Sequence, residues 1–295
     1  MYSSLLYWFY FQQHQLCLSD KECQLLEYCE SNLKFIPPNK WITIVTRFDD
    51  YNKFKYSDYT LSNELLAFNQ KENILKLIKE IRKKLNCIII IVDDSSDLKT
   101  SKILKKSKIR NLKYYNRGKK SGRGSAVLFG FKKILKMKKN ISCFIEMDAD
   151  FSHSPSELKR NISYFYSNSL DLLIGSRYLY GSKIINWPLS RRILSKFSNK
   201  LAKILLGVPV NDYTNGYRFY SKPAVKTIIS KCNKTGGGFI ILSEIILVLW
   251  KMNYKISEIK SIFKNRVRGE SSVNLSLIIQ SFFGLLKLYI LKKSL

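Results

Sequence analysis

Histidines and acidic residues are scarce in this sequence of 295 residues, and its cysteines lack the spacing of a metal site. The only histidines are His14 and His153, and 22 acidic residues stand against 51 Lys and Arg, so the formal net charge is +29. The six cysteines form neither a CxxC pair nor a spaced set with histidine, which argues against a structural zinc site and a secreted disulfide framework. The aromatic run near the N-terminus lacks the basic residues of a signal peptide. We therefore expect reduced thiols in a cytosolic compartment and no secretion.

The large positive charge indicates an anionic partner. Nucleic acid, an anionic membrane surface and phosphorylated substrates are three partners of this kind. The basic residues are spread along the whole chain without a block of five or six in a row, and no recognised nucleic-acid-binding module is visible. Nucleic acid is therefore the least favoured of the three.

Helical and strand patterns alternate along most of the chain. The predicted helices are Lys71–Leu85, Leu98–Lys106, Ala126–Lys136 and Pro155–Tyr166, the last with Ser154 as its N-cap. The predicted strands are Cys87–Val92, Asn111–Tyr115, Ser142–Met147 and Asp171–Ile174. The first of these strands is apolar at every position, as expected where helices cover both faces of a sheet. We predict an α/β fold with a mainly parallel sheet over residues 61–272, preceded by an extension of uncertain structure, residues 1–60.

Acidic residues follow two of the predicted strands. Asp93 and Asp94 end one strand, and Asp148 and Asp150 end another. Ligands bind beyond the carboxyl ends of strands in open α/β sheets, and two carboxylates at this spacing can hold a hard cation such as Mg²⁺ or Mn²⁺. Acidic residues in such places also cap helices, so both interpretations stay open. For His153, beside the second pair, we expect a structural or capping role rather than a catalytic one.

Residues 273–295 are predicted to form an amphipathic C-terminal helix. The apolar run Leu275–Leu291 is too short and too polar for a membrane span. Its polar positions recur at steps of four, four and three and share one stripe, and they are Ser276, Gln280, Gly284 and Lys287. Such a helix, followed by two lysines, suits a membrane interface, and a buried helix packed on the core is the alternative.

Eight pieces of the chain, in the right order, resemble the family 2 glycosyltransferases of the dolichol-phosphate mannose synthase type. The pieces are LLAFNQKENI (65–74), IIVDDSS (90–96), GKKSGRGSAVLFG (118–130), FIEMDADFSHSP (144–155), LIGSRY (173–178), WPLSRR (187–192), DYTNGYRFY (212–220) and NRVRGESS (265–272). The resemblance implies a single Rossmann-like domain of the GT-A type that binds a nucleotide-sugar.

The resemblance also implies roles for residues in these pieces. The nucleotide-sugar would contact Leu66, Phe68, Gln70, Val92, Asp94, Asp148, Ala149, Asp150, Arg191, Arg266 and Ser272. The divalent metal would be held by Asp148, Asp150 and Ser152, and the acceptor phosphate by Arg177 and Arg192. The residues implied to act in catalysis are Asp148, Asp150, Arg177 and Arg266.

The reaction that the resemblance implies is an inverting, Mg²⁺- or Mn²⁺-dependent transfer of a sugar, most often mannose from GDP-mannose, to a dolichyl or polyprenyl phosphate. Because the family usually has Glu where this chain has Gln70, transfer from a UDP-sugar, such as glucose to a polyprenyl phosphate, is the first alternative. An inactive cationic module that binds membranes or nucleic acid is the second. The resemblance further implies peripheral association with the cytoplasmic face of a membrane, and a separate membrane-anchoring subunit is compatible with it.

Overall fold

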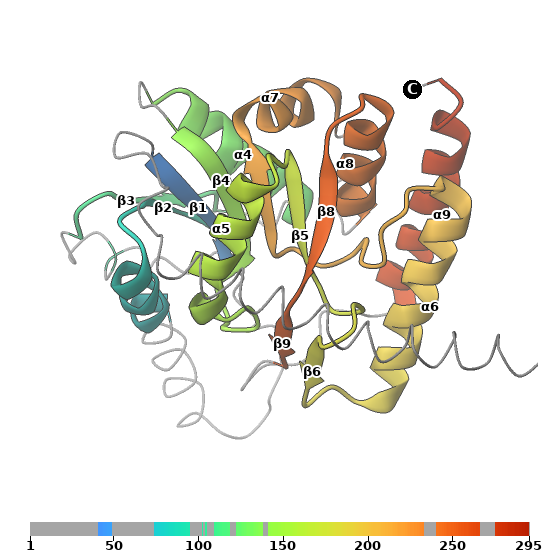
Figure 1. The fold of residues 1–295 in the computed structure, drawn as a ribbon, viewed down its shortest axis with the longest axis horizontal. Helices are drawn as coiled ribbons and strands as arrows, with labels where there is room; N and C mark the ends of the chain where they lie inside the picture. The colour runs from blue at the N-terminus through green and yellow to red at the C-terminus, as the bar shows by residue number, and fades with distance from the viewer. Residues whose placement is uncertain are drawn as a thin grey trace, which may run out of the picture.

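A seven-stranded sheet in the order β3-β2-β1-β4-β7-β5-β8 forms the centre of the fold (Figure 1). The structure is a computed structural model that describes residues 41–48, 74–94, 102, 104, 109–118, 122–137, 141–232, 240–265 and 275–294. The strands of the sheet are β1 (Trp41–Phe48), β2 (Ile88–Asp93), β3 (Leu112–Asn116), β4 (Ile141–Asp148), β5 (Leu172–Ser176), β7 (Arg218–Ser221) and β8 (Ile256–Lys260). A small second sheet pairs β6 (Lys183–Ile185) with β9 (Ile262–Lys264).

The large sheet is parallel except at one strand. β1 pairs in parallel with β2 and β4, β2 with β3, and β5 with β8. β7 lies antiparallel between β4 and β5. The carboxyl ends of β1, β2, β4 and β5 therefore meet at one edge of the sheet, which is where α/β folds place their ligands. The predicted mainly parallel sheet is confirmed.

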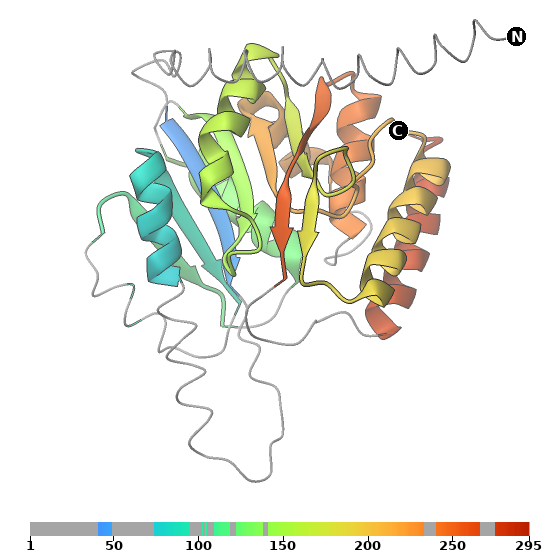
Figure 2. The same cartoon turned by 60° about the horizontal axis from the view of Figure 1, so that its bottom comes forward.

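Helices cover both faces of this sheet (Figures 1 and 2). These helices include α4 (Arg123–Leu135), η2 (Pro155–Glu157), α5 (Leu158–Ser167), α6 (Leu189–Leu206), α7 (Lys222–Lys231), α8 (Ile240–Lys251) and α9 (Leu275–Leu291). One face packs against α4, α7 and α8, and the other packs against α5 and a helix at residues 74–84.

The strand β2 shows how the two cores are divided. Ile88 and Ile90 lie in the core beneath α4, and Ile89 and Ile91 lie in the opposite core with the helix at 74–84. Because successive side chains of a strand point to opposite faces, a strand covered on both sides must be apolar throughout. Burial of each isoleucine side chain contributes about 1.5–3 kcal/mol.

Four of the observed strands match the predicted ones. β2, β3, β4 and β5 agree with the predicted boundaries to within two residues at each end. The helix predicted from Pro155 is a 3₁₀ turn followed by α5, and the hydroxyl of Ser154 accepts a hydrogen bond from the Ser156 N–H, as expected of an N-cap. α4 begins earlier than predicted, at Arg123. Most of the helix predicted at 98–106 lies outside the described residues.

Five of the observed strands are not predicted from the sequence, and they are β1, β6, β7, β8 and β9. Of these, β1 lies between β2 and β4 in the middle of the sheet. From the sequence we expect residues 1–60 to form an extension outside the sheet. The structure instead places β1, which comes from that range, within the sheet. The rest of the range lies outside the described residues.

The C-terminal helix α9 packs on the fold with one side only. Leu285 and Leu288 are buried against the core, and a Cβ on Gly284 would stand 2.8 Å from Cγ1 of Ile240 in α8. Gly284 therefore lies on the packed side, whereas Gln280 and Lys287 of the same predicted stripe are exposed. Phe283 is 64% exposed on another side, so α9 has features of both the buried and the interfacial alternatives. Among the described helices, none is long and apolar enough to cross a membrane.

Candidate functional site

A tight turn at the end of β4 carries the two predicted metal-binding aspartates. Asp148 ends the strand, and Ala149 and Asp150 form the turn. Phe151 follows with a φ of 61°, a left-handed conformation that a bulky residue rarely adopts and that is often found at functional sites. The Ser152 N–H donates to Oδ1 of Asp150 at 3.0 Å. The backbone thus fixes the direction of the Asp150 carboxylate.

The His153 side chain contacts the backbone of this turn. Its Nδ1 accepts a hydrogen bond from the Asp148 N–H at 3.1 Å, and its Nε2 lies 2.9 Å from Oδ1 of Asn215. The ring is fully buried and stacks on Tyr217 with ring centroids 5.0 Å apart. Because Nδ1 accepts, Nε2 carries the proton and donates to the amide oxygen. Both ring nitrogens are occupied, so the structure agrees with the expected structural role.

A buried arginine that we did not single out from the sequence binds the first aspartate. Nη1 of Arg123 donates to Oδ1 of Asp148 at 2.6 Å, and its Nε and Nη2 donate to Oε1 of Glu146 at 3.2 and 3.0 Å. The Tyr220 hydroxyl donates to the other oxygen of Glu146 at 2.8 Å. Burial alone would lower the pKa of Arg123, but the charges of Asp148 and Glu146 outweigh it and raise the pKa. The backbone beside the guanidinium is Gly216, where a Cβ would stand 1.6 Å from Nη2.

A second arginine pair lies at the end of β2. Nε and Nη2 of Arg117 donate to the two oxygens of Asp94 at 2.5 Å each, and Nη1 donates to Oγ of Ser125 at 2.7 Å. Asp94 is buried, and the guanidinium of Arg117 contacts both oxygens of the carboxylate that we expect to contact the nucleotide. Val92 is fully buried in the apolar core, and the structure does not bring its side chain to the strand end.

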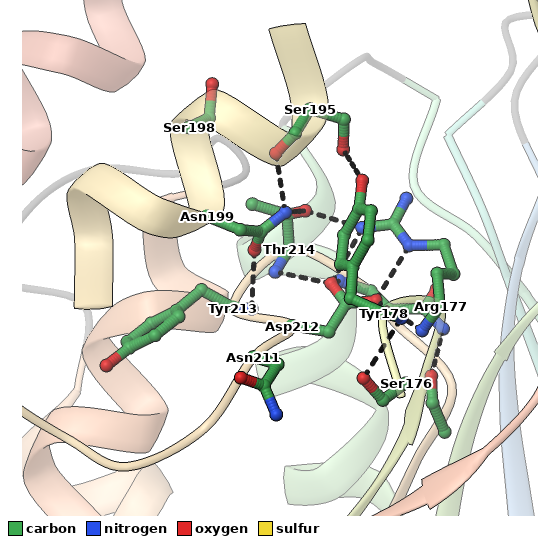
Figure 3. A network of polar contacts seen from close by, with 12 residues as sticks. Ser176, Arg177, Tyr178, Ser195, Ser198, Asn199, Asn211, Asp212, Tyr213 and Thr214 are labelled. Atoms are coloured by element: carbon green, nitrogen blue, oxygen red, sulfur yellow. Dashed lines mark hydrogen bonds and ion pairs between the residues drawn. The ribbon is translucent and has the colours of Figure 1, made fainter. Parts of the chain in front are cut away.

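Arg177, at the end of β5, is held by Asp212 (Figure 3). Nε and Nη2 of Arg177 donate to the two carboxylate oxygens at 2.8 and 2.7 Å, and Nη2 also donates to Oγ1 of Thr214 at 2.6 Å. Burial alone would raise the pKa of Asp212, but the charge and hydrogen bonds of Arg177 outweigh it and lower the pKa. Burial alone would lower the pKa of Arg177, but the charge and hydrogen bonds of Asp212, together with smaller contributions that include the charge of Asp148, raise it. Asn215 connects the end of β5 with the turn after β4, because its N–H donates to Oδ1 of Asp212 at 3.0 Å and its Oδ1 lies 2.9 Å from Nε2 of His153.

The same network ties α6 to the end of β5 (Figure 3). Oδ1 of Asn199 accepts from the Tyr213 N–H at 2.6 Å, and its Nδ2 donates to Oγ1 of Thr214 at 3.2 Å. The Tyr178 hydroxyl donates to Oγ of Ser195 at 2.6 Å. The middle of α6 is therefore held in place beside Arg177.

Two arginines at the start of α6 complete the cationic side of the site. The guanidinium of Arg191 lies 4.3 Å from the ring centroid of Trp187, and that of Arg177 lies 5.3 Å from the same ring. Nη1 of Arg191 also donates to Oδ1 of Asn265 at 3.4 Å. Arg192 is exposed and donates to a backbone carbonyl at 2.8 Å. An aromatic ring thus holds two of the predicted phosphate-binding arginines near each other.

The structure describes only part of the predicted site. The predicted site residues that lie outside the described ranges are Leu66, Phe68, Gln70, Arg266 and Ser272. The polar partners that sequence reasoning missed are Arg117, Arg123, Glu146, Asp212, Thr214 and Asn215. The last three lie in the piece at 212–220, where a polar run before an apolar strand was the available signal.

The oxygen atoms at the turn after β4 fit a hard divalent cation. Asp148 and Asp150 supply carboxylates, and Ser152 has a buried hydroxyl without a hydrogen-bond partner in the described part of the chain. A buried hydroxyl without a partner is unusual and is a candidate to bind or position an added group. No group of three or more His, Cys, Asp and Glu side chains that could hold a metal occurs within the described ranges. Mg²⁺ is commonly bound by one or two carboxylates together with substrate phosphates. This turn can provide the two carboxylates.

Comparison with protein families matches residues 65–229 to the glycosyl transferase family 2. The polyprenol monophosphomannose synthase of Mycolicibacterium smegmatis is 31% identical over 224 residues, which cover 74% of this chain and 82% of the relative. The dolichol-phosphate mannosyltransferase of Pyrococcus furiosus is 32% identical over 214 residues, which cover 70% of this chain and 57% of the relative. The chain therefore spans little more than half the length of that second relative.

A solved structure supports the fold. Glucosyl-3-phosphoglycerate synthase from Mycobacterium tuberculosis, in complex with Mn²⁺, UDP and glucosyl-3-phosphoglycerate, matches with a TM-score of 0.55 at 13% identity. The match covers 89% of this chain and 82% of the other. At this identity the likeness bears on the fold alone, and it agrees with the predicted GT-A type of α/β domain.

Proposed function

The chain belongs to the glycosyl transferase family 2, and on this premise we propose that it transfers a mannosyl residue from GDP-mannose to a polyprenyl phosphate. The observation that carries the proposal is the chain of hydrogen bonds that connects the Asp148–Asp150 turn, through His153, Asn215 and Asp212, with Arg177. Arg191 lies on the same Trp187 ring as Arg177. The names of the two relatives support the sugar and the acceptor.

The chemistry needs an anionic nucleophile and a stabilised leaving group. In the proposed reaction a phosphate oxygen of the acceptor forms a bond to the anomeric carbon, and the bond from that carbon to the nucleoside diphosphate breaks with inversion. The acceptor phosphate is already ionised near neutral pH, so no side chain has to remove a proton. The full occupation of both nitrogens of His153 is compatible with this route. A divalent cation held by Asp148 and Asp150 would offset the charge that develops on the leaving diphosphate.

An aspartate variant tests the proposal. Asp150→Asn should abolish Mg²⁺- or Mn²⁺-dependent mannosyl transfer to a polyprenyl phosphate while the unfolding midpoint stays close to that of the parent protein. Glu80→Gln, on the helix at 74–84 with an exposed partner in Lys83, is the matched control and should keep full activity. Transfer that persists in a chelator-treated assay would exclude the metal role.

A screen of donors tests the sugar and the base. Each purified donor, GDP-mannose or UDP-glucose, is incubated with a polyprenyl phosphate and Mn²⁺, and labelled lipid is extracted. We expect product from GDP-mannose. Product from UDP-glucose alone would replace the mannosyl proposal with the alternative suggested by Gln70, and the absence of product with every donor would favour an inactive module.

We further propose that an apolar surface formed by α6 and α9 rests on an anionic membrane. The two helices contact each other and lie side by side in both views (Figures 1 and 2). Their exposed large apolar residues are Leu189, Ile193, Phe197, Ile204, Ile279, Phe282, Phe283, Tyr289 and Ile290. Their exposed basic residues include Lys196, Lys200, Lys203 and Lys287, and neither helix contains an acidic residue. Apolar and lysine side chains on one surface, without carboxylates, complement anionic headgroups.

Co-sedimentation with vesicles tests this surface. The parent protein should bind vesicles that contain phosphatidylglycerol and bind pure phosphatidylcholine vesicles more weakly. Phe197→Ser combined with Phe283→Ser should reduce the bound fraction at least fivefold. Met252→Ser, at an apolar position that is 43% exposed and lies outside both helices, is the control. Equal binding by all three proteins would show that the membrane contacts another part of the chain.

A further inference from the structure

We propose that Arg123 is a positioning residue that acts as a resident counter-charge on Asp148 and weakens the binding of a free divalent cation. The cation then binds well only together with the diphosphate of the donor. This proposal rests on the proposed function, because it concerns the same metal and the same turn.

Arg123 is fixed in place on every side. It is only 6% exposed, it is the first residue of α4, and all three of its side-chain nitrogens donate to carboxylate oxygens. The close approach of Gly216 leaves no room for the guanidinium to move toward β7. The positive charge of Arg123 is therefore always present beside the turn after β4.

The geometry separates two tasks of the guanidinium. Nε and Nη2 neutralise Glu146, which is 1% exposed and also bound by Tyr220. Nη1 makes a separate contact with Asp148, and at 2.6 Å it is the shortest of the three. If Arg123 served only to neutralise a buried glutamate, this third contact would not be needed.

The contact with Asp148 bears directly on metal binding. One oxygen of the carboxylate already accepts from a cation, and a divalent ion on the same carboxylate would be repelled by it. Asp148, Asp150 and Glu146 carry three negative charges and Arg123 removes one of them, so the attraction for a free cation is reduced. A bound diphosphate adds negative charge and new oxygen ligands, which restores the attraction.

The test compares two variants, one that keeps the positive charge of Arg123 and one that lacks it. Glu146→Gln keeps Arg123 on Asp148, whereas the double variant Arg123→Met with Glu146→Gln removes both members of the buried pair together. A double replacement avoids leaving one buried charge alone, the change that destabilises folded proteins most. Binding of Mn²⁺ is measured by electron paramagnetic resonance, first without nucleotide and then with GDP.

We expect Mn²⁺ without nucleotide to bind the double variant at least tenfold more tightly than Glu146→Gln. The gain in Mn²⁺ affinity on adding GDP should be smaller in the double variant. Equal Mn²⁺ affinities would overturn the proposal. If the double variant does not fold, Arg123→Lys replaces it: lysine keeps the charge, so Mn²⁺ binding should stay weak, and a tenfold tightening would overturn the electrostatic role.

The readout also separates this proposal from the proposed function. Mn²⁺ affinity is measured without any sugar donor, so a failure of mannosyl transfer leaves the expected difference between the variants in place. Conversely, active transfer combined with unchanged Mn²⁺ affinities would refute the role of Arg123 and leave the transferase function standing.

Discussion

Replacing Gly216 by alanine should release Arg123 from its two carboxylates. A Cβ at this position would stand 1.6 Å from Nη2 and 2.4 Å from Cζ of the guanidinium, far inside contact distance. The clash is with the end of a flexible side chain, so the backbone need not move. Relief requires only that Arg123 swing away, and then its bonds to Glu146 and Asp148 are lost.

The cost is therefore that of breaking a buried ion pair rather than that of overpacking. Removing one partner of such a pair costs about 3–5 kcal/mol, whereas an added methyl group in a core costs about 1–3 kcal/mol. We expect Gly216→Ala to lower the free energy of unfolding by about 3–5 kcal/mol. Against a total of about 5–15 kcal/mol for a typical domain, this is a large and easily measured loss.

Urea denaturation of four proteins provides the measurement: the parent, Gly216→Ala, Arg123→Met and the double variant. In the Arg123→Met background the clashing atoms are absent, so the alanine should cost less than about 1 kcal/mol. The two substitutions should then be strongly non-additive, and the double variant should be about as stable as Arg123→Met alone. If the alanine costs the same in both backgrounds, the cause is not the guanidinium and the reasoning fails.

Three further predictions rest on other parts of the fold. Asp212→Asn should cost about 3–5 kcal/mol because it leaves Arg177 buried without its carboxylate. Because the pKa of Asp212 is lowered in the folded protein, its contribution to the free energy of unfolding is complete above its ordinary pKa of 3.8 and is lost as the pH falls through the folded pKa. Urea denaturation between pH 6 and 3 should show this loss of stability in the parent but not in the variant. Burial raises the pKa of the Cys87 thiol to about 11, so iodoacetamide at pH 8 should label it only after unfolding, and labelling of the folded protein at the rate of an unfolded peptide would contradict this. Gly284→Val should cost about 1–3 kcal/mol and speed hydrogen exchange in α9, because its Cβ would press on Ile240, whereas unchanged exchange would show that α9 is not held there.

The parts of the fold that follow from local pattern could be predicted from the sequence. The continuous apolar run that becomes β2 predicts burial on both faces, and each of its residues is buried. The Ser154-Pro155 pair marks the start of the next helical segment because it supplies a cap and a residue with a suitable fixed φ. These signals need no knowledge of distant residues.

Two of the strands that were missed, β1 and β7, owe their position in the sheet to partners elsewhere in the chain. β7 has only four residues and begins with Arg218, a residue type that is rarely buried. Its guanidinium is fully buried because carbonyls of Tyr213, Asn215 and Leu242 accept its hydrogen bonds. β1 owes its place to pairing with β2 and β4 on either side. The run WITIVTRF is rich in β-branched residues and so carries a local strand signal for β1, but its position in the sheet depends on its partners.

The residues of the site, like the strands, could be predicted only where a local pattern marks them. The aspartates stand out because they follow apolar strands, but the arginines that hold them come from other segments. Arg123 lies 25 residues before Asp148, and Asp212 lies 35 residues after Arg177. Sequence spacing carries no information about such pairs, since only the order of the strands in the sheet brings them together.

The arginines of this region differ in the net charge that they add under the proposed function. Two anions about 6 Å apart at an effective dielectric of about 20 repel each other by roughly 3 kcal/mol, so the meeting of acceptor phosphate and donor requires uncompensated positive charge. The charges of Arg117, Arg123 and Arg177 are each balanced by a carboxylate. Arg177 can therefore orient a phosphate by hydrogen bonding but adds little net charge. Arg192 donates to a backbone carbonyl and forms no ion pair within the described residues, so under the proposed function its charge would lower this repulsion. For joining two anions, the total of +29 thus matters less than the position of those few cations that no carboxylate neutralises.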